Sequence, residues 1–208
     1  MIKDKYYKEL LNKNIYISEE SLVDEKAVIL FNSIILGKTI IEENAVIGPN
    51  SIIIDSKICK NCHILNSIVT DSMIGENTTV GPFASIKKES NIGCDCRIGN
   101  FVEVKNSQIL DNTKAAHLAY IGDSFVGKRC NFGCGSITVN YDGKRKYQTV
   151  IGNDVFIGSN SNIVAPITIN DNSFIACGST ITKDVPQNTL AIERSKQINK
   201  VDYFKNKQ

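Results

Sequence analysis

Isoleucine occupies every sixth position near the C-terminal end of the chain, at Ile151, Ile157, Ile163, Ile169, Ile175 and Ile181. Four residues after each member comes a small or β-branched residue, namely Val155, Ser161, Ile167, Ser173, Ser179 and Val185. A period of six fits neither the helical repeat of about 3.6 residues nor a simple two-residue alternation. It predicts a parallel β-helix, in which short strands stack into rungs around a narrow apolar column.

The same period runs back through most of the chain, at Ile29, Ile35, Ile41, Ile47 and Ile53 and again at Ile74, Val80, Ile86, Ile92, Ile98 and Val104. The spacing shortens to five around Ile58, Ile64 and Val69 and near Ile109 and Val126, as short turns would produce. The pattern resembles that of hexapeptide-repeat proteins, whose all-β, left-handed parallel β-helix uses three hexads for each triangular coil. Residues 25–186 would then form about nine coils over roughly 40 Å. A β-sandwich is disfavoured, because it has no reason to keep one phase of six for so long.

Composition indicates one domain with short appendages, since the chain has 208 residues. The net charge of +2 is too weak to favour nucleic acid or a membrane surface as a partner. We expect residues 1–24 to form a helical or extended segment, with a short amphipathic helix carrying Tyr6, Leu10 and Leu11, and residues 187–208 to form a tail. The charged start lacks the apolar stretch of a signal peptide, so a soluble, cytoplasmic protein is expected.

Seven cysteines could indicate disulfides, a metal or a haem, and Cys59, Cys62 and His63 match the C-x-x-C-H spacing of haem attachment. However, Cys62, Cys96 and Cys130 each stand four residues after an inward position. The repeat takes a small side chain there, and a free thiol packs as a small hydrophobe. Haem attachment would also require export. We therefore predict reduced packing cysteines and no required metal.

The period fails most clearly between Phe132 and Ile151, where residues 138–149 form a polar, basic, glycine-bearing loop. Loops that project from a rigid scaffold commonly carry binding residues, so this loop is a candidate active-site segment. Upstream of it, His117 follows an inward position by two residues and is expected to face outward. Taken alone, an outward histidine is as often an ordinary surface residue as a functional one.

Five segments near this loop carry a close resemblance to a known family. They are 99–105 (GNFVEVK), 114–123 (KAAHLAYIGD), 140–143 (NYDG), 150–159 (VIGNDVFIGS) and 190–194 (LAIER). Through them, residues 74–195 resemble the acetyltransferase domain of the bifunctional N-acetylglucosamine-1-phosphate uridylyltransferase/glucosamine-1-phosphate acetyltransferase family. Serine and galactoside acetyltransferases share the hexads but not these segments.

The resemblance implies a role for each matching position. His117 corresponds to the catalytic base of the family. The sugar-phosphate contacts correspond to Lys105, Tyr120, Asn131 and Lys146, and the acetyl-CoA contacts to Asn140, Tyr141, Ser159 and Arg194. At two further coenzyme positions the family usually has alanine and this chain has Cys134 and Cys177. The resemblance also implies a homotrimer with active sites between neighbouring prisms.

Two departures from the family bear on the substrate. Lys87 stands where the family has a phosphate-binding arginine, and lysine keeps the charge but loses the two-pronged fork. No nucleotidyltransferase domain precedes the repeats, so we expect that this chain does not make the uridylyl product itself and that a separate uridylyltransferase is a candidate partner.

The expected reaction is acetyl transfer from acetyl-CoA to the amine of glucosamine-1-phosphate, which feeds UDP-N-acetylglucosamine synthesis. The amine must lose a proton before it attacks the thioester, and histidine, with a reference pKa of about 6.5, suits that step. The oxyanion that forms needs a donor, for which the resemblance suggests a backbone N–H near Cys134. Cys134 as an acyl-accepting nucleophile is a less favoured alternative.

Other interpretations stay open. One is acetylation of another amino-sugar phosphate or of a nucleotide-linked amino sugar. Another is a non-catalytic hexapeptide-repeat subunit that scaffolds a partner enzyme. A metal-dependent lyase of the hexapeptide-repeat carbonic anhydrase type would need three histidines, whereas the chain has only His63 and His117.

Overall fold

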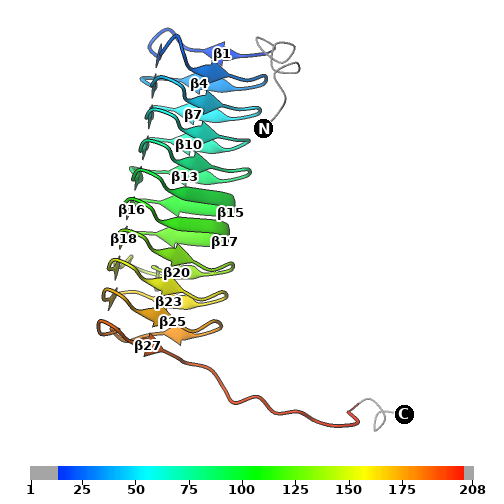
Figure 1. The fold of residues 1–208 in the computed structure, drawn as a ribbon, viewed down its shortest axis with the longest axis vertical. Coiled ribbons are helices and arrows are strands. Elements are labelled where there is room, and N and C mark those ends of the chain that lie inside the picture. The colour runs from blue at the N-terminus through cyan, green and yellow to red at the C-terminus, as the bar shows by residue number, and fades with distance from the viewer. Residues whose placement is uncertain (1–13, 204–208) are drawn as a thin grey trace.

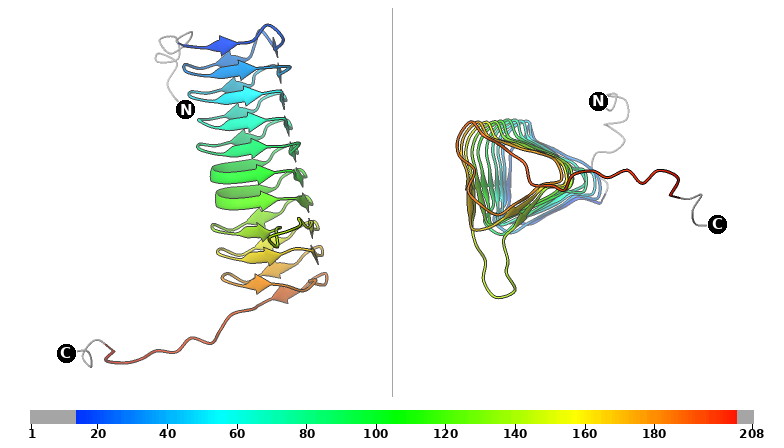
Figure 2. Two further views of the ribbon diagram at one scale, coloured as in Figure 1. Left: turned by 180° about the vertical axis from the view of Figure 1, so that it is seen from behind. Right: turned by 90° about the horizontal axis from the view of Figure 1, so that it is seen from below.

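The computed structural model describes residues 14–203, which form a solenoid of short parallel strands (Figure 1). Viewed along its axis the solenoid has a triangular outline, from which one loop and the C-terminal segment project (Figure 2). The predicted all-β parallel solenoid is therefore confirmed. Residues 14–203 contain no helix, and hence none that could cross a membrane. Tyr6, Leu10 and Leu11, which were expected in an N-terminal helix, lie outside the described residues.

Each turn contributes strands to three faces, which we call faces A, B and C. Face A consists of β3 (Val28–Ile29), β6 (Val46–Ile47), β9 (His63–Ile64), β12 (Thr79–Val80), the first parts of β15 (Arg97–Lys105) and β17 (Lys114–Gly122), β19 (Asn131–Phe132), β22 (Phe156–Ile157), β25 (Phe174–Ile175) and β27 (Leu190–Ala191). Face B consists of β1 (Tyr16–Ile17), β4 (Ile34–Leu36), β7 (Ile52–Ile54), β10 (Ile68–Thr70), β13 (Ser85–Lys87), the last parts of β15 and β17, β20 (Ile137–Val139), β23 (Asn162–Val164) and β26 (Thr180–Ile181).

Face C is a separate nine-stranded sheet. It consists of β2 (Leu22–Val23), β5 (Ile40–Ile41), β8 (Lys57–Ile58), β11 (Met73–Ile74), β14 (Asn91–Ile92), β16 (Gln108–Ile109), β18 (Ser124–Val126), β21 (Thr149–Ile151) and β24 (Ile167–Ile169). Faces A and B join into one 18-stranded sheet, because β15 and β17 each continue around the corner between them.

The period of six produces the core. All the isoleucines and valines of the predicted series are buried, and so are the residues four positions after Ile151 and its successors. Side chains such as Ile35, Ile86 and Ile98 are fully buried, and burial of one isoleucine contributes about 1.5–3 kcal/mol. The solenoid also begins before residue 25, since β1 pairs with β4 and β2 with β5. Ile17 and Val23 precede Ile29 at the same spacing of six, so the period itself extends into this segment.

The inward cysteines pack as predicted. Cys62, Cys96 and Cys130 are buried, and the thiol of Cys62 donates to the carbonyl of Gly75 at 3.0 Å. Burial raises the pKa of Cys62 to about 12 and that of Cys96 to about 11, so both stay as neutral thiols. All seven cysteines are free, but Cys134 and Cys177 are exposed rather than packed.

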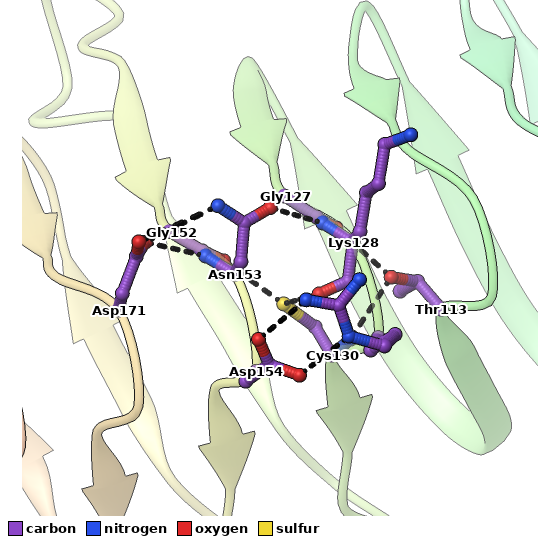
Figure 3. Close-up of polar contacts among 9 residues, drawn as sticks. Thr113, Gly127, Lys128, Cys130, Gly152, Asn153, Asp154 and Asp171 are labelled. Carbon is purple, nitrogen blue, oxygen red and sulfur yellow. Dashed lines mark hydrogen bonds and ion pairs between the residues drawn. The ribbon is translucent and has the colours of Figure 1, made fainter.

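Polar side chains tie successive turns together at the corner between faces C and A (Figure 3). The side-chain oxygen of Asn153 accepts the N–H of Lys128 at 2.9 Å, and the N–H of Asn153 donates to Asp171 at 2.7 Å. Arg129 pairs with Asp154 through two hydrogen bonds, of 2.7 and 2.6 Å. A two-pronged pair of this kind fixes geometry as well as charge. The corner therefore sets the stacking of the turns on both sides of residues 138–149.

Candidate active site

His117 lies at the corner between faces A and B, on one of the two long strands that continue around it. Ala115 is buried and His117 is exposed, as the repeat predicts. Nδ1 of His117 lies 2.7 Å from Oδ1 of Asn100, which occupies the equivalent position on β15. The remaining ring nitrogen, Nε2, is thus free of this contact and belongs to a solvent-exposed ring.

The same corner carries four of the six predicted coenzyme residues. Backbone hydrogen bonds connect successive turns at this corner. The N–H of Gly135 donates to the carbonyl of Leu118 at 2.7 Å. On the next two turns, the N–H of Asn160 donates to the carbonyl of Cys134 and the N–H of Gly178 to that of Ser159, both at 2.8 Å. Cys134, Ser159 and Cys177 therefore occupy successive turns beyond His117. Arg194 extends this column, because its Nη1 donates to the carbonyl of Cys177 at 3.1 Å. We call these four residues the corner column.

Predicted phosphate-binding residues gather on face B. Lys87 lies in register with Lys105, and Glu103 with Tyr120. Nζ of Lys87 lies 3.0 Å from a carboxylate oxygen of Glu103. This ion pair is substantially exposed, so its contribution to folding is small and it positions the lysine more than it stabilises the chain. Face B thus presents two cations and a phenol beside the His117 corner.

A polar network connects face B to the base of the loop formed by residues 138–149. Asn140 donates to the hydroxyl of Tyr120 at 3.3 Å and to the carboxylate of Asp123. Nζ of Lys146 lies 3.9 Å from the same carboxylate. A Cβ on Gly122 would lie 2.3 Å from the Tyr120 hydroxyl oxygen, so only glycine leaves room for this network. Two predicted sugar-phosphate residues and one predicted coenzyme residue are brought together here.

Asp142 orders the exposed tip of the loop. Its carboxylate accepts the N–H groups of Lys144 and Arg145, both at 2.7 Å, and the hydroxyl of Tyr147 at 3.0 Å. The N–H of Arg145, followed by that of Lys144, lowers the pKa of Asp142. The hydrogen bond to Asp142 in turn raises the pKa of Tyr147. The loop therefore has a defined shape although it projects from the prism (Figure 2).

Not all predicted residues converge within one chain. Asn131 lies on face A, where it is in register with Lys114 on one neighbouring strand and Phe156 on the other. Tyr120 lies on face B, so the His117 corner separates it from Asn131. Tyr141 is 57% exposed on the projecting loop. A hollow of about 500 Å³ beside this loop is lined by Asp123 and Lys146 among others, but not by His117 or Lys87. The predicted residues therefore do not all line this hollow.

Three residues of this surface escaped the sequence analysis, namely Asn100, Glu103 and Asp123. Asn100 and His117 are 17 residues apart, and so are Glu103 and Tyr120. That separation is one turn at this height of the solenoid, so counting one turn back from each predicted residue would have found the first two. Within residues 14–203, no group of three or more His, Cys, Asp or Glu side chains is arranged to hold a metal ion.

Comparisons with known proteins agree with the repeat. The family described as bacterial transferase hexapeptide (six repeats) matches residues 148–183, and the hexapeptide repeat of succinyl-transferase matches residues 38–71. The GMPPB C-terminal domain matches residues 70–160. The UDP-N-acetylglucosamine acyltransferase of Francisella novicida shares the fold, with a TM-score of 0.56 and 19% identity over 84% of this chain and 65% of that chain.

Much higher identity links the chain to proteins called bifunctional protein GlmU. The protein from Clostridium perfringens is 56% identical over 186 residues, and that from Clostridium acetobutylicum is 52% identical over 185 residues. Each match covers 89% of this chain and 41% of the relative, so the chain spans less than half the length of these relatives. The chain therefore belongs to the hexapeptide-repeat proteins and is a homologue of one part of the bifunctional GlmU proteins.

Proposed function

We propose that the chain is an acetyl-CoA-dependent N-acetyltransferase whose acceptor is the amine of glucosamine-1-phosphate. The observation that carries the proposal is the position of His117, an exposed imidazole between the cationic residues of face B and the corner column. Homology to GlmU proteins at 52–56% identity supports the same reaction, as does the resemblance of the segments that contain these residues.

In the proposed mechanism, Nε2 of His117 removes a proton from the ammonium group of the sugar. The amine nitrogen then attacks the carbonyl carbon of the thioester, and a backbone N–H of the corner column near Cys134 donates to the oxyanion. After the attack the nitrogen still carries two hydrogens and a positive charge, and it releases one of these protons to solvent. The C–S bond breaks, and the imidazolium returns the first proton to the leaving thiolate. General-base assistance of this kind accelerates a reaction by about 10²–10⁴-fold. No covalent intermediate on Cys134 is required.

The phosphate of the acceptor would bind at Lys87 and Lys105, with Tyr120, Asn131 and Lys146 as further contacts. The two lysines lie in register on adjacent strands and so present two ammonium groups on one face. Acetyl-CoA would lie along Cys134, Ser159, Cys177 and Arg194, and also contact Asn140 and Tyr141. Since Asn131 and the loop lie on different faces of the prism, we further propose a homotrimer in which neighbouring prisms complete each site.

The test is the His117→Ala variant, assayed with acetyl-CoA and glucosamine-1-phosphate by thiol release. We expect kcat to fall by at least about 10²-fold, because the general base is lost. Acetyl-CoA binding by calorimetry and the thermal unfolding midpoint should be unchanged, since the exposed ring packs in no turn. His63→Ala, on the distant strand β9, is the matched control and should keep its activity. Wild-type kcat in His117→Ala would refute the proposal.

A further inference from the structure

We infer that Asn100 is a positioning residue that fixes the tautomer of His117, so that Nδ1 carries the proton and Nε2 is the base. The inference rests on the proposed function for its catalytic meaning. Its structural content, the protonation pattern of one imidazole ring, can be measured without any substrate.

The backbone brings the two side chains together for a local reason. Asn100 and His117 are register partners on β15 and β17, and each is followed by a residue with a positive φ, Phe101 at 57° and Leu118 at 41°. The two strands therefore turn the same corner with the same shape. A Cβ on Gly99 would lie 1.9 Å from the carbonyl oxygen of Ala116, so glycine is needed for this close approach.

The contact determines which nitrogen holds the proton. Oδ1 of Asn100 is an acceptor only, so at 2.7 Å it requires a hydrogen on Nδ1 of His117. In a neutral imidazole the other nitrogen then carries the lone pair. Without this acceptor, an exposed ring would distribute between two tautomers and several orientations, and only some of these would present Nε2 to an incoming amine.

The pair differs from the asparagine ladders elsewhere in the solenoid. Asn14, Asn32 and Asn50 also contact one another from turn to turn, at 3.3 and 3.1 Å. Those residues have positive φ values themselves, and asparagine is favoured at such positions because it tolerates this conformation in turns. The turn conformation therefore accounts for their presence. Asn100 does not occupy the positive-φ position of its turn, which Phe101 takes. Its side chain is therefore available to the histidine.

Other titratable groups on the same and neighbouring turns must be separated from Asn100 in any pH experiment. On β15 they are Arg97, Glu103 and Lys105, on β17 they are Lys114 and Tyr120, and Cys134 follows on the next turn. In the register of the two strands, Arg97 lies beside Lys114 and Glu103 beside Tyr120. Only Asn100 among the residues of β15 is in register with His117.

The direct test is a long-range ¹H–¹⁵N NMR spectrum, which distinguishes the two tautomers of each histidine. With two histidines in the chain, His63 provides the internal reference, and its signals are assigned with His63→Gln. We expect His117 to hold its proton on Nδ1 in the wild type and to show a tautomer mixture in Asn100→Leu. A proton on Nε2 in the wild type, or no change in Asn100→Leu, would overturn the inference.

Kinetics provide the second measurement. Asn100→Leu should lower kcat by about 10–100-fold, as loss of a ligand-orienting partner does at metal-bound histidines, with little change in KM for acetyl-CoA. Asn100→Asp keeps the acceptor and adds a negative charge, so the acid limb of the kcat/KM profile should move upward by about one pH unit. Asn32→Asp, far along the solenoid, is the matched control and should leave that limb in place.

The experiments distinguish the role of His117 from the role of Asn100. If His117→Ala retains wild-type kcat, the proposed function is wrong, whatever the NMR spectrum shows. If His117→Ala is inactive while the pH profile of Asn100→Asp superimposes on that of the wild type, His117 is the base but Asn100 does not position it.

Discussion

At the scale of single residues, Lys87 stands at a position where the resemblance leads us to expect an arginine. The side chain forms an exposed ion pair with Glu103 and lies in register with Lys105, so it is already held on the face that the acceptor phosphate would occupy. An ammonium group can donate to a phosphate as a point charge, but it lacks the fixed pair of donors that a guanidinium has. In the proposed site, the lysine would therefore affect the strength of phosphate binding more than the position of the phosphate.

We expect Lys87→Arg to lower KM for glucosamine-1-phosphate by up to about tenfold, which corresponds to the low end of a charge-assisted hydrogen bond. Lys87→Met, which removes the charge but keeps the length, should raise KM for the sugar by more than that. KM for acetyl-CoA should stay constant in both variants. If neither substitution changes KM for glucosamine-1-phosphate while glucosamine or another amino sugar reacts faster, the acceptor is not this phosphate.

At the scale of elements, the period of six predicted the solenoid and its inward positions because burial repeats with the turn. The period alone assigns Ile98 and Val104 to the core, without information about which residues contact them. Contacts between turns were harder to predict because the length of a turn varies. The side chains of Lys87 and Glu103 are 16 residues apart, those of Asn100 and His117 are 17 apart, and Arg129 and Asp154 are 25 apart across the inserted loop.

The loop illustrates the same limit, since the sequence marked residues 138–149 as irregular but did not reveal what orders them. Asp142 accepts from two backbone N–H groups and from the hydroxyl of Tyr147, and the N–H groups lower its pKa. A carboxylate whose pKa is lowered is protonated only when the pH falls through the lowered pKa, which lies below the ordinary pKa of an aspartate. At assay pH the loop therefore keeps this acceptor, and only substitution removes it.

We expect Asp142→Ala to speed tryptic cleavage after Lys144 and Arg145, because the loop samples open conformations more often. kcat/KM for acetyl transfer should fall, while the thermal unfolding midpoint should stay within about 2 °C of the wild type, since the loop adds little to the core. Asp142→Asn keeps one acceptor oxygen for the backbone, so its cleavage rate should lie between those of the wild type and Asp142→Ala. Equal cleavage rates in all three proteins would show that Asp142 does not order the loop.

At the scale of the whole molecule, the proposed homotrimer predicts how neighbouring subunits would share a site. One loop projects from the prism (Figure 2), and it is the loop of residues 138–149 that carries Tyr141. His117, in contrast, lies at the corner between faces A and B. If a neighbouring prism receives this loop, His117 of one subunit and Tyr141 of the next act together. His117→Ala and Tyr141→Ala, each of low activity alone, should then complement each other when differently tagged chains are co-expressed and mixed trimers are purified.

Rotational symmetry fixes the size of the effect. Every mixed trimer contains one interface of three at which both contributing residues are intact, so the purified mixed trimers should have about a third of the wild-type kcat, and the unselected products of random assembly about a quarter. If instead His117 and Tyr141 act within the same chain, no mixed trimer has an intact site, and activity stays at the level of the separate variants. Sedimentation velocity must show a trimer in both preparations. A monomer would exclude the shared site directly, because the loop would have no neighbour to reach.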